Sequence, residues 1–340
     1  MFGIFRYLLA HIVVVSHLWP TWGDWGGTYA AFAFYVLSGY LTTRSMREVY
    51  GFAPRAVGFF LINRFLRLAP LYWCVLSISV FLLWLAPNAG HALLPAYQLP
   101  DRSTDWLANV FVLGLDGAHA VLLPTAQTLG LFLVFYVLIA LGLSRYRRGV
   151  WLWLVASGIY TGYLLASGAD VASRTHTLAA VALPFGVGAL LAHYPLLTFR
   201  ASPAHAMLAV GLFIVHCLLT SVIWTDPYGA GLYVSLALAA YAVATLRHLD
   251  SHRMPLSVQH VEHECGALSY PVFLLQWLAA LLVVAIDAAS PDFDNGWLFV
   301  TAVTLTDMMA WVSYHYLERH IEALRARVRL HAAEMRGQHD

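Results

Sequence analysis

Long apolar stretches recur along the whole chain and are separated by short polar segments. A helix that crosses a bilayer needs about 20 consecutive, mostly apolar residues. Stretches of about this length lie near residues 2–20, 28–43, 66–86, 126–143, 150–167, 177–193, 204–224, 229–246, 267–287 and 297–318. The pattern therefore predicts an all-α fold, a polytopic transmembrane helix bundle of about ten spans.

Two segments depart from this alternation. Residues 87–125 form the longest connection, and "WLANVFVLGL" within it predicts a short re-entrant or interfacial helix. At the end of the chain, residues 321–340 predict a basic amphipathic cytoplasmic tail that lies on anionic lipid. We therefore expect one transmembrane domain over residues 1–320, followed by a tail over residues 321–340.

Composition supports the membrane interpretation. The 340 residues are 60% hydrophobic and 11% charged, whereas a soluble domain carries roughly 25% charged residues. The chain thus lacks the polar surface that a soluble globule needs. Three cysteines lie within or at the ends of apolar stretches, at spacings that predict neither a metal site nor a disulfide framework.

The arginines predict the orientation. All 19 basic residues are arginines. If the N-terminus is cytoplasmic, 17 of them fall in or beside cytoplasmic segments, and Arg102 and Arg174 fall outside. Because cytoplasmic loops carry the excess of basic residues, we expect both termini in the cytoplasm.

The first apolar stretch carries ionisable side chains at Arg6, His11 and His17. Such groups cost a few kcal/mol in hydrocarbon, which makes them candidates for function. Arg6 and His17 are eleven residues apart, so they lie within about 20° on one helix face and about 16 Å apart along its axis. A neutral imidazole suits a general base. In the alternative interpretation, Arg6 is an interfacial anchor and His17 an interfacial residue.

Arg64 and Arg67 follow each other at i and i+3 beside the stretch at 66–86. Two guanidinium groups on one face could bind a phosphate bidentately, although arginines flanking a span also follow from the positive-inside rule. Ser38 and Gly39 are small residues within the second stretch. They permit either close helix packing or room for a substrate.

Asp307 lies near the centre of the last stretch. A carboxylate at this depth should face the bundle interior, either paired or protonated. It is therefore a candidate catalytic acid or a structural hydrogen-bonding group.

Six segments, in order along the chain, resemble the acyltransferase-3 family of bacterial integral-membrane O-acyltransferases. Arg6 and His17 are similar to the family's arginine–x10–histidine pair. "FYVLSGYL" resembles Phe-Phe-Val-Leu-Ser-Gly-Phe-Leu, "RFLRLAPLYW" resembles the R-x-x-R segment, and "WLANVFVLG" resembles the stretch before the fourth long span. "LSYPVFLLQW" and "YHYLERHI" resemble Ile-Ser-Tyr-x-x-Tyr-Leu-Leu-His-x and the closing Ile-Glu-Arg-Pro segment. The resemblance covers almost the whole chain.

The resemblance implies an acyltransferase of the bacterial cytoplasmic (inner) membrane. It would move an acyl group, with acetyl as the expected one, from cytoplasmic acyl-CoA to a hydroxyl of an extracytoplasmic or lipid-linked carbohydrate. The partners implied are this acceptor and membrane lipid, with no nucleic acid and no metal.

Site residues are also implied by the resemblance. Arg64 and Arg67 would bind the phosphates of acyl-CoA, and the pantetheine arm would pass Ser38 and Gly39. His17 would act as the base. Arg6 would assist on the donor side, so that the polar face of the first span lines the route from donor to acceptor.

Three positions depart from the family pattern. Phe132 stands where the family has glutamate, Gln127 where it has tryptophan, and Gln276 where histidine is common. Asp307 and Asp116 are the candidates to replace the missing acid. The departures keep open a non-catalytic relative that transports or exports a glycan or an acylated intermediate. A structural partner of an envelope complex is a third reading.

Overall fold

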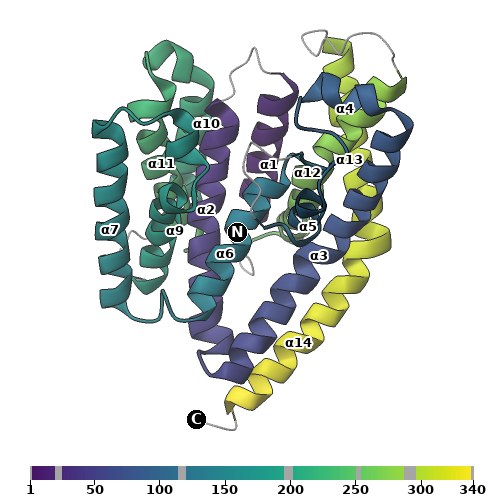
Figure 1. Ribbon diagram of the computed structural model, residues 1–340. Coiled ribbons are helices and arrows are strands. Elements are labelled where there is room, and N and C mark those ends of the chain that lie inside the picture. Colours follow the sequence, from purple (N-terminus) through teal and green to yellow (C-terminus); the bar gives the residue numbers. More distant parts are fainter. Residues whose placement is uncertain are drawn as a thin grey trace.

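The computed structural model describes residues 2–19, 25–113, 120–194, 202–249, 254–286 and 296–337. Regular secondary structure in these ranges is helical throughout, and an isolated bridge joins Tyr97 and Val121. The predicted all-α fold is therefore confirmed. The helices stand side by side in a bundle, with α14 extending beyond it beside α3 (Figure 1).

Each predicted stretch lies on a helix: α1 (Gly3–Leu18), α2 (Trp25–Ser45), α3 (Pro54–Leu85), α6 (Ala126–Ala140), α7 (Arg147–Ala166), α9 (Leu178–His193), α10 (Pro203–Ile223), α11 (Leu232–Leu246), α12 (Leu256–Ile286) and α13 (Gly296–Ser313). Within the described ranges, seven helical segments are long and apolar enough to cross a membrane. Helices α1 and α6 are apolar but have only 16 and 15 residues, and α2 is not among the seven. The chain is thus a membrane protein, while the count of ten spans and the sidedness of the termini stay predictions.

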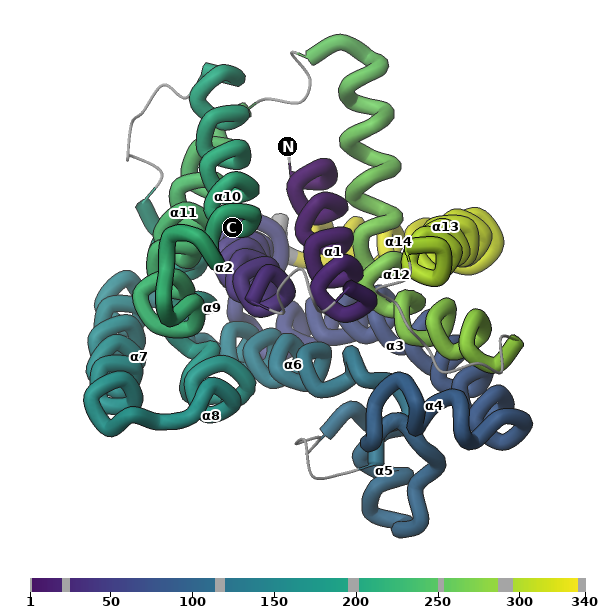
Figure 2. Tube along the Cα trace, turned by 90° about the horizontal axis from the view of Figure 1, so that it is seen from above, coloured from purple at the N-terminus to yellow at the C-terminus, as the bar shows by residue number. Residues whose placement is uncertain are grey.

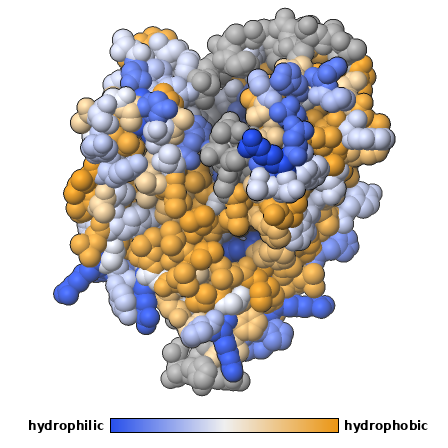
Figure 3. Space-filling view, in the orientation of Figure 1, coloured by the Kyte–Doolittle hydropathy of each residue, from blue (hydrophilic) through white to orange (hydrophobic). Residues whose placement is uncertain are grey.

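The outer surface agrees with this assignment. Figure 3 shows hydrophobic residues in a broad belt across the middle of one face, with hydrophilic residues gathered towards its upper and lower edges. Large apolar side chains such as Trp84, Leu152 and Val222 are exposed. In a bilayer these side chains would lie against lipid, where they carry no penalty.

The long connection after α3 contains two short helices, α4 (Pro87–Leu93) and α5 (Ser103–Phe111). The predicted interfacial segment, residues 106–115, thus overlaps a nine-residue helix that begins three residues before it. Its buried Asn109 ties the connection together, because the side chain donates to the carbonyl of Ala120 over 2.9 Å and accepts from the amide of Leu122 over 2.8 Å.

Helix α1 lies between α2 and α12 when the bundle is seen from above (Figure 2). Glycines let α1 and α12 approach to backbone contact. A Cβ built on Gly3 would lie 1.9 Å from the carbonyl oxygen of Glu262, and one on Gly266 would lie 2.7 Å from Nη2 of Arg6. Small residues at a helix interface allow such close packing.

A second close pair is α2 and α9. A Cβ on Gly39 would lie 2.2 Å from the carbonyl oxygen of Phe185, and one on Gly188 would lie 1.9 Å from that of Val36. Both obstacles are backbone atoms that cannot rotate away. Gly39 therefore serves the packing of these two helices.

We predict that Gly39→Ala destabilises the protein by about 1–3 kcal/mol, the usual cost of forcing extra atoms into a packed site. Thermal unfolding of the purified protein in detergent measures the effect. Gly158→Ala on α7 is the matched control, because a Cβ there meets nothing within 4 Å. Equal melting temperatures for the two variants would contradict the assignment of Gly39 to packing.

Three arginines from different parts of the chain meet at the C-terminus of α9. Arg47, Arg147 and Arg247 donate to the carbonyls of Ala192, His193 and Leu191 over 2.8, 3.1 and 2.6 Å, respectively. The last carbonyls of a helix have no partner within it and carry partial negative charge. These arginines, which the sequence marks as orienting residues, thus also cap a helix.

Helix α14 (Arg319–Gly337) follows α13 through a π-helical turn at Tyr314–Glu318. One face of it packs against the first half of α3, and Ile321, Arg325 and Ala332 are buried there. The predicted tail helix therefore starts at Arg319 and lies against protein on this face, so that only its opposite face is left for lipid. An amphipathic pattern predicts that one face of a helix is covered, but it does not distinguish lipid from protein as the cover.

Candidate functional site

The candidate site is an interior cavity of about 250 Å³ that Arg6, Arg64 and Arg67 line together. It lies between α1, α2, α3, α6 and α12. The other lining residues are Phe34, Leu37, Ser38, Leu41, Thr42, Ser45, Leu68, Leu129, Phe132, Tyr136, Ser269, Tyr270 and Phe273. Three guanidinium groups from two helices thus converge on one space inside the bundle.

The positive charge of this cavity is not balanced within it. None of the described residues in its lining is acidic. Nη2 of Arg6 donates to the carbonyl of Gly266 over 3.2 Å, but the Nε atoms of Arg6 and Arg64 are buried without a hydrogen-bond partner. Arg64 also lies over the rings of Phe60 and Tyr136, 5.0 and 5.2 Å from their centroids.

Burying guanidinium groups around a space whose described lining has no carboxylate is expensive, and buried donors without partners add to the cost. A bound anion with several acceptor oxygens would remove both penalties. Phosphate fits best, because guanidinium groups bind its oxygens in parallel pairs. The cavity is therefore suited to an anionic, phosphate-bearing ligand.

Helix α2 supplies a polar stripe to the cavity. Ser38, Thr42 and Ser45 are spaced at i, i+4 and i+7, so they share one helix face, and all three line the cavity. Gly39 points to α9 instead. Sequence reasoning missed Thr42 and Ser45, although their spacing from Ser38 is a signal that could have found them.

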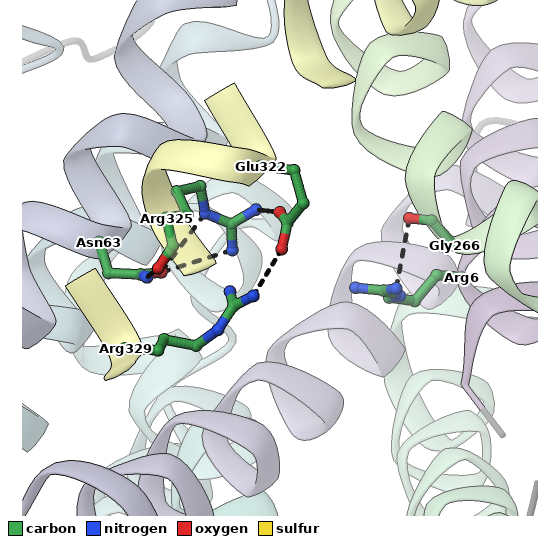
Figure 4. A network of polar contacts seen from close by, with 6 residues as sticks. All are labelled: Arg6, Asn63, Gly266, Glu322, Arg325 and Arg329. Atoms are coloured by element: carbon green, nitrogen blue, oxygen red, sulfur yellow. Dashed lines mark hydrogen bonds and ion pairs between the residues drawn. The ribbon is translucent and has the colours of Figure 1, made fainter. Parts of the chain in front are cut away.

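A second and larger hollow, the vestibule, adjoins the cavity. Its volume is about 990 Å³. Arg6, Leu41 and Arg67 line both spaces. The other vestibule residues are Phe2, Gly3, Gln259, Glu262, His263, Gly266, Ala267, Tyr314, Glu318, Arg319, Glu322, Ala323, Arg325, Ala326 and Arg329. Figure 4 looks into this region from close by, with Arg6 opposite the side chains of α14.

His17 lies outside the lining of the cavity, towards the other end of α1. Its Nδ1 is 3.0 Å from Oε1 of Gln276, and its ring lies 5.3 Å from that of Trp277. It therefore faces α12, as Arg6 does, and its side chain is accessible. Gly266 and Gln276, the partners of Arg6 and His17, are ten residues apart on α12, or about 15 Å along its axis.

Gln276 fixes the proton on His17. Its Nε2 donates to the carbonyl of Phe273 over 2.8 Å, so its Oε1 is the atom that faces His17. An amide oxygen only accepts, and Nδ1 must therefore carry the proton. In the neutral imidazole, Nε2 of His17 is then the unprotonated nitrogen, the form that a general base requires.

Removing the acceptor at Gln276 should weaken any function of His17 as a base. If His17 acts as a base, we expect Gln276→Leu to lower the base-dependent rate by roughly 10- to 100-fold, the range for partners that orient a functional imidazole. Gln276→Glu keeps an acceptor for the Nδ1 proton and should retain more activity, with a changed pH profile. Initial rates of the base-dependent reaction compare the two variants, and equal losses would count against this role.

Asp307 does not approach His17. Its Oδ1 lies 3.1 Å from Nε2 of His11 and accepts from the hydroxyl of Tyr7 over 3.3 Å. It thus links α13 to α1 and lies outside the cavity lining. The sequence could not identify this partner, because periodicity does not show which helices are neighbours.

Phe132, at the family's glutamate position, does line the cavity. Its ring packs against those of Tyr35 and Phe185, with centroids 5.0 and 5.6 Å away. An aromatic side chain thus lines the cavity at the position that the sequence resemblance aligned with a glutamate. Gln127 lies in the first turn of α6 and is absent from the lining, and Asp116 lies outside the described residues.

No group of three or more histidine, cysteine, aspartate or glutamate side chains that could hold a metal ion is found in the described part of the chain. No family model, curated protein or solved structure matches the sequence.

Proposed function

We propose that the protein is a membrane-bound O-acyltransferase. It would move an acyl group, acetyl in the simplest case, from cytoplasmic acyl-CoA to a hydroxyl of an extracytoplasmic or lipid-linked carbohydrate. The observation that carries this proposal is the buried cavity with three arginines and no acidic residue among its described lining. Such a site is suited to a ligand that brings its own negative charge.

The two adjoining spaces suit the two parts of acyl-CoA. The vestibule, at about 990 Å³, falls within the size of known ligand sites, roughly 300–1,000 Å³. The nucleotide end would lie there, with its pyrophosphate where the two spaces meet, on Arg67, which lines both, and on Arg64, which lines the cavity. The narrower cavity of about 250 Å³ would take the pantetheine arm. Ser38, Thr42 and Ser45 offer hydroxyl groups to the amides of that arm.

His17 would act where the arm ends. Nε2 takes the proton of the acceptor hydroxyl, whose oxygen attacks the thioester carbonyl. A C–O bond forms and the C–S bond breaks. The proton on the imidazole then passes to the CoA thiolate. Arg6, about 16 Å away along α1, holds the donor end of the same path.

The distribution of arginines supports a cytoplasmic side for the donor, and the family resemblance supports the bacterial inner membrane. The donor would enter from the cytoplasm of a bacterial cell, and the protein would lie in its inner membrane. The carbohydrate acceptor would approach His17 from the other side.

Acyl analysis of surface glycans tests the proposal. Cells with and without the protein are compared for ester-linked acyl groups by mass spectrometry of isolated glycans. We expect the ester to disappear with the protein and to return when the protein is supplied again. Identical ester content in both strains would contradict the proposal.

A non-catalytic exporter of a glycan or acylated intermediate is the second candidate. It is favoured by Phe132, which makes the cavity wall aromatic at the position of the family's glutamate. An exporter would need no acyl donor and would tolerate His17→Ala. Measuring glycan export in that variant separates the two functions.

A further inference from the structure

Helix α14 brings three further arginines to the vestibule, outside the cavity: Arg319, Arg325 and Arg329. Arg325 and Arg329 line the vestibule and not the cavity. One carboxylate, that of Glu322, bonds to both: Nη1 of Arg325 contacts one oxygen, and Nη2 of Arg329 lies 2.8 Å from the other (Figure 4). Each oxygen of the Glu322 carboxylate thus forms an ion pair with one guanidinium group.

Arg325 is held in place from the other side. Its Nε and Nη2 each lie 3.4 Å from Oδ1 of Asn63. The side-chain Nδ2 of Asn63 donates in turn to the backbone carbonyl of Arg325 over 3.1 Å. The Arg325 side chain is only 10% exposed, whereas that of Glu322 is 48% exposed. The cation is therefore held by α3, while its anionic partner is half exposed and already lines the vestibule.

We propose that Arg325 and Arg329 form a binding site for the ribose 3′-phosphate of the donor, and that Glu322 occupies this site when the donor is absent. The inference rests on the proposed function, since it assumes that acyl-CoA enters the vestibule. With the arm in the cavity, the adenosine end stays in the vestibule, where these two arginines lie. A phosphate presents more oxygens and more charge than a carboxylate, so it can displace Glu322 from both guanidinium groups.

The charge of the vestibule favours this exchange. Its described lining contains five arginines and three glutamates. One of the glutamates, Glu262, accepts from the amides of Gly3 and Ile4 over 2.6 and 3.0 Å, so the N-terminus of α1 already holds its charge. The arginines of the lining thus outnumber the glutamates whether or not Glu322 bonds to them, and the phosphate would balance this excess.

The test compares binding of CoA with binding of dephospho-CoA, which lacks the 3′-phosphate, to the full-length protein in detergent. We expect the wild type to bind CoA at least tenfold more tightly. Arg329→Gln should remove this preference and leave the affinity for dephospho-CoA unchanged. Glu322→Gln should raise the affinity for CoA several-fold and that for dephospho-CoA little.

Arg327→Gln is the matched control, because Arg327 is exposed on the same helix and lies outside the vestibule lining. It should keep the wild-type preference. If the wild type does not distinguish the two ligands, or if Arg329→Gln weakens both equally, the 3′-phosphate site is wrong.

The two proposals fail in different ways. A 3′-phosphate preference that depends on Arg329, in a protein that transfers no acyl group, supports this site and contradicts the acyltransferase. Acyl transfer with equal use of the two donor forms supports the acyltransferase and contradicts this site.

Discussion

Replacing His17 with alanine should lower acyl transfer by about 10²- to 10⁴-fold, the contribution of a general base. Affinity for CoA should change by less than about twofold, because His17 lies outside the cavity lining. As a general base it would take part in proton transfer and not in donor binding. Radiolabelled acetyl transfer and binding calorimetry measure the two effects on the same preparation.

His17→Asn is the sharper variant. Its side-chain amide can still donate to Oε1 of Gln276, so packing and that hydrogen bond are kept while the base is lost. It should be as inactive as His17→Ala and fold as well as the wild type. Substantial transfer by His17→Asn would show that His17 is not the base.

Neutralising the arginines of the cavity should have the largest effect on donor binding. We expect Arg64→Gln and Arg67→Gln each to weaken CoA binding by about 10- to 100-fold, since hydrogen bonds to charged groups are worth roughly 1.5–3 kcal/mol. Calorimetric titration of CoA into each purified variant gives the affinities.

Arg55→Gln is the control for charge. Arg55 lies on the same helix, is exposed and lines neither space. It should bind CoA as the wild type does. If Arg55→Gln and Arg67→Gln lowered the affinity for CoA equally, the arginines of α3 would attract the donor only by long-range electrostatics, and not by direct contact.

Much of the arrangement within single helices could be predicted from the sequence. The distance and angle between Arg6 and His17 follow from helix geometry, and both side chains face α12. Arg64 and Arg67, three residues apart, line one cavity. These relations depend only on the regular turn of an α-helix.

Relations between helices could not be predicted, because a single sequence does not show which faces meet. Ser38 and Gly39 are neighbours in the chain, yet about 100° of helix rotation turns one to the cavity and the other to α9. The pairing of Asp307 with His11 also depends on neighbouring helices.

The C-terminal helix α14 is another case in which the sequence pattern did not show which surface a helix packs against. Charges at helical spacing predict a helix with one apolar face, and lipid and protein both satisfy such a face. Here α3 covers it, and Asn63 bonds to Arg325. Because α14 packs in this way, its arginines reach the vestibule.

The central proposal is that the arginine cavity binds the acyl donor and that His17, about 16 Å from Arg6 along α1, is the base for transfer to the acceptor. The most direct measurement supplies radiolabelled acetyl-CoA to the cytoplasmic face of the protein in liposomes, with extracted envelope glycan on the opposite face. We predict that the glycan becomes labelled, that free CoA appears in equal amount, and that His17→Asn abolishes both. Glycan that stays unlabelled while the wild-type protein binds the donor would contradict the account.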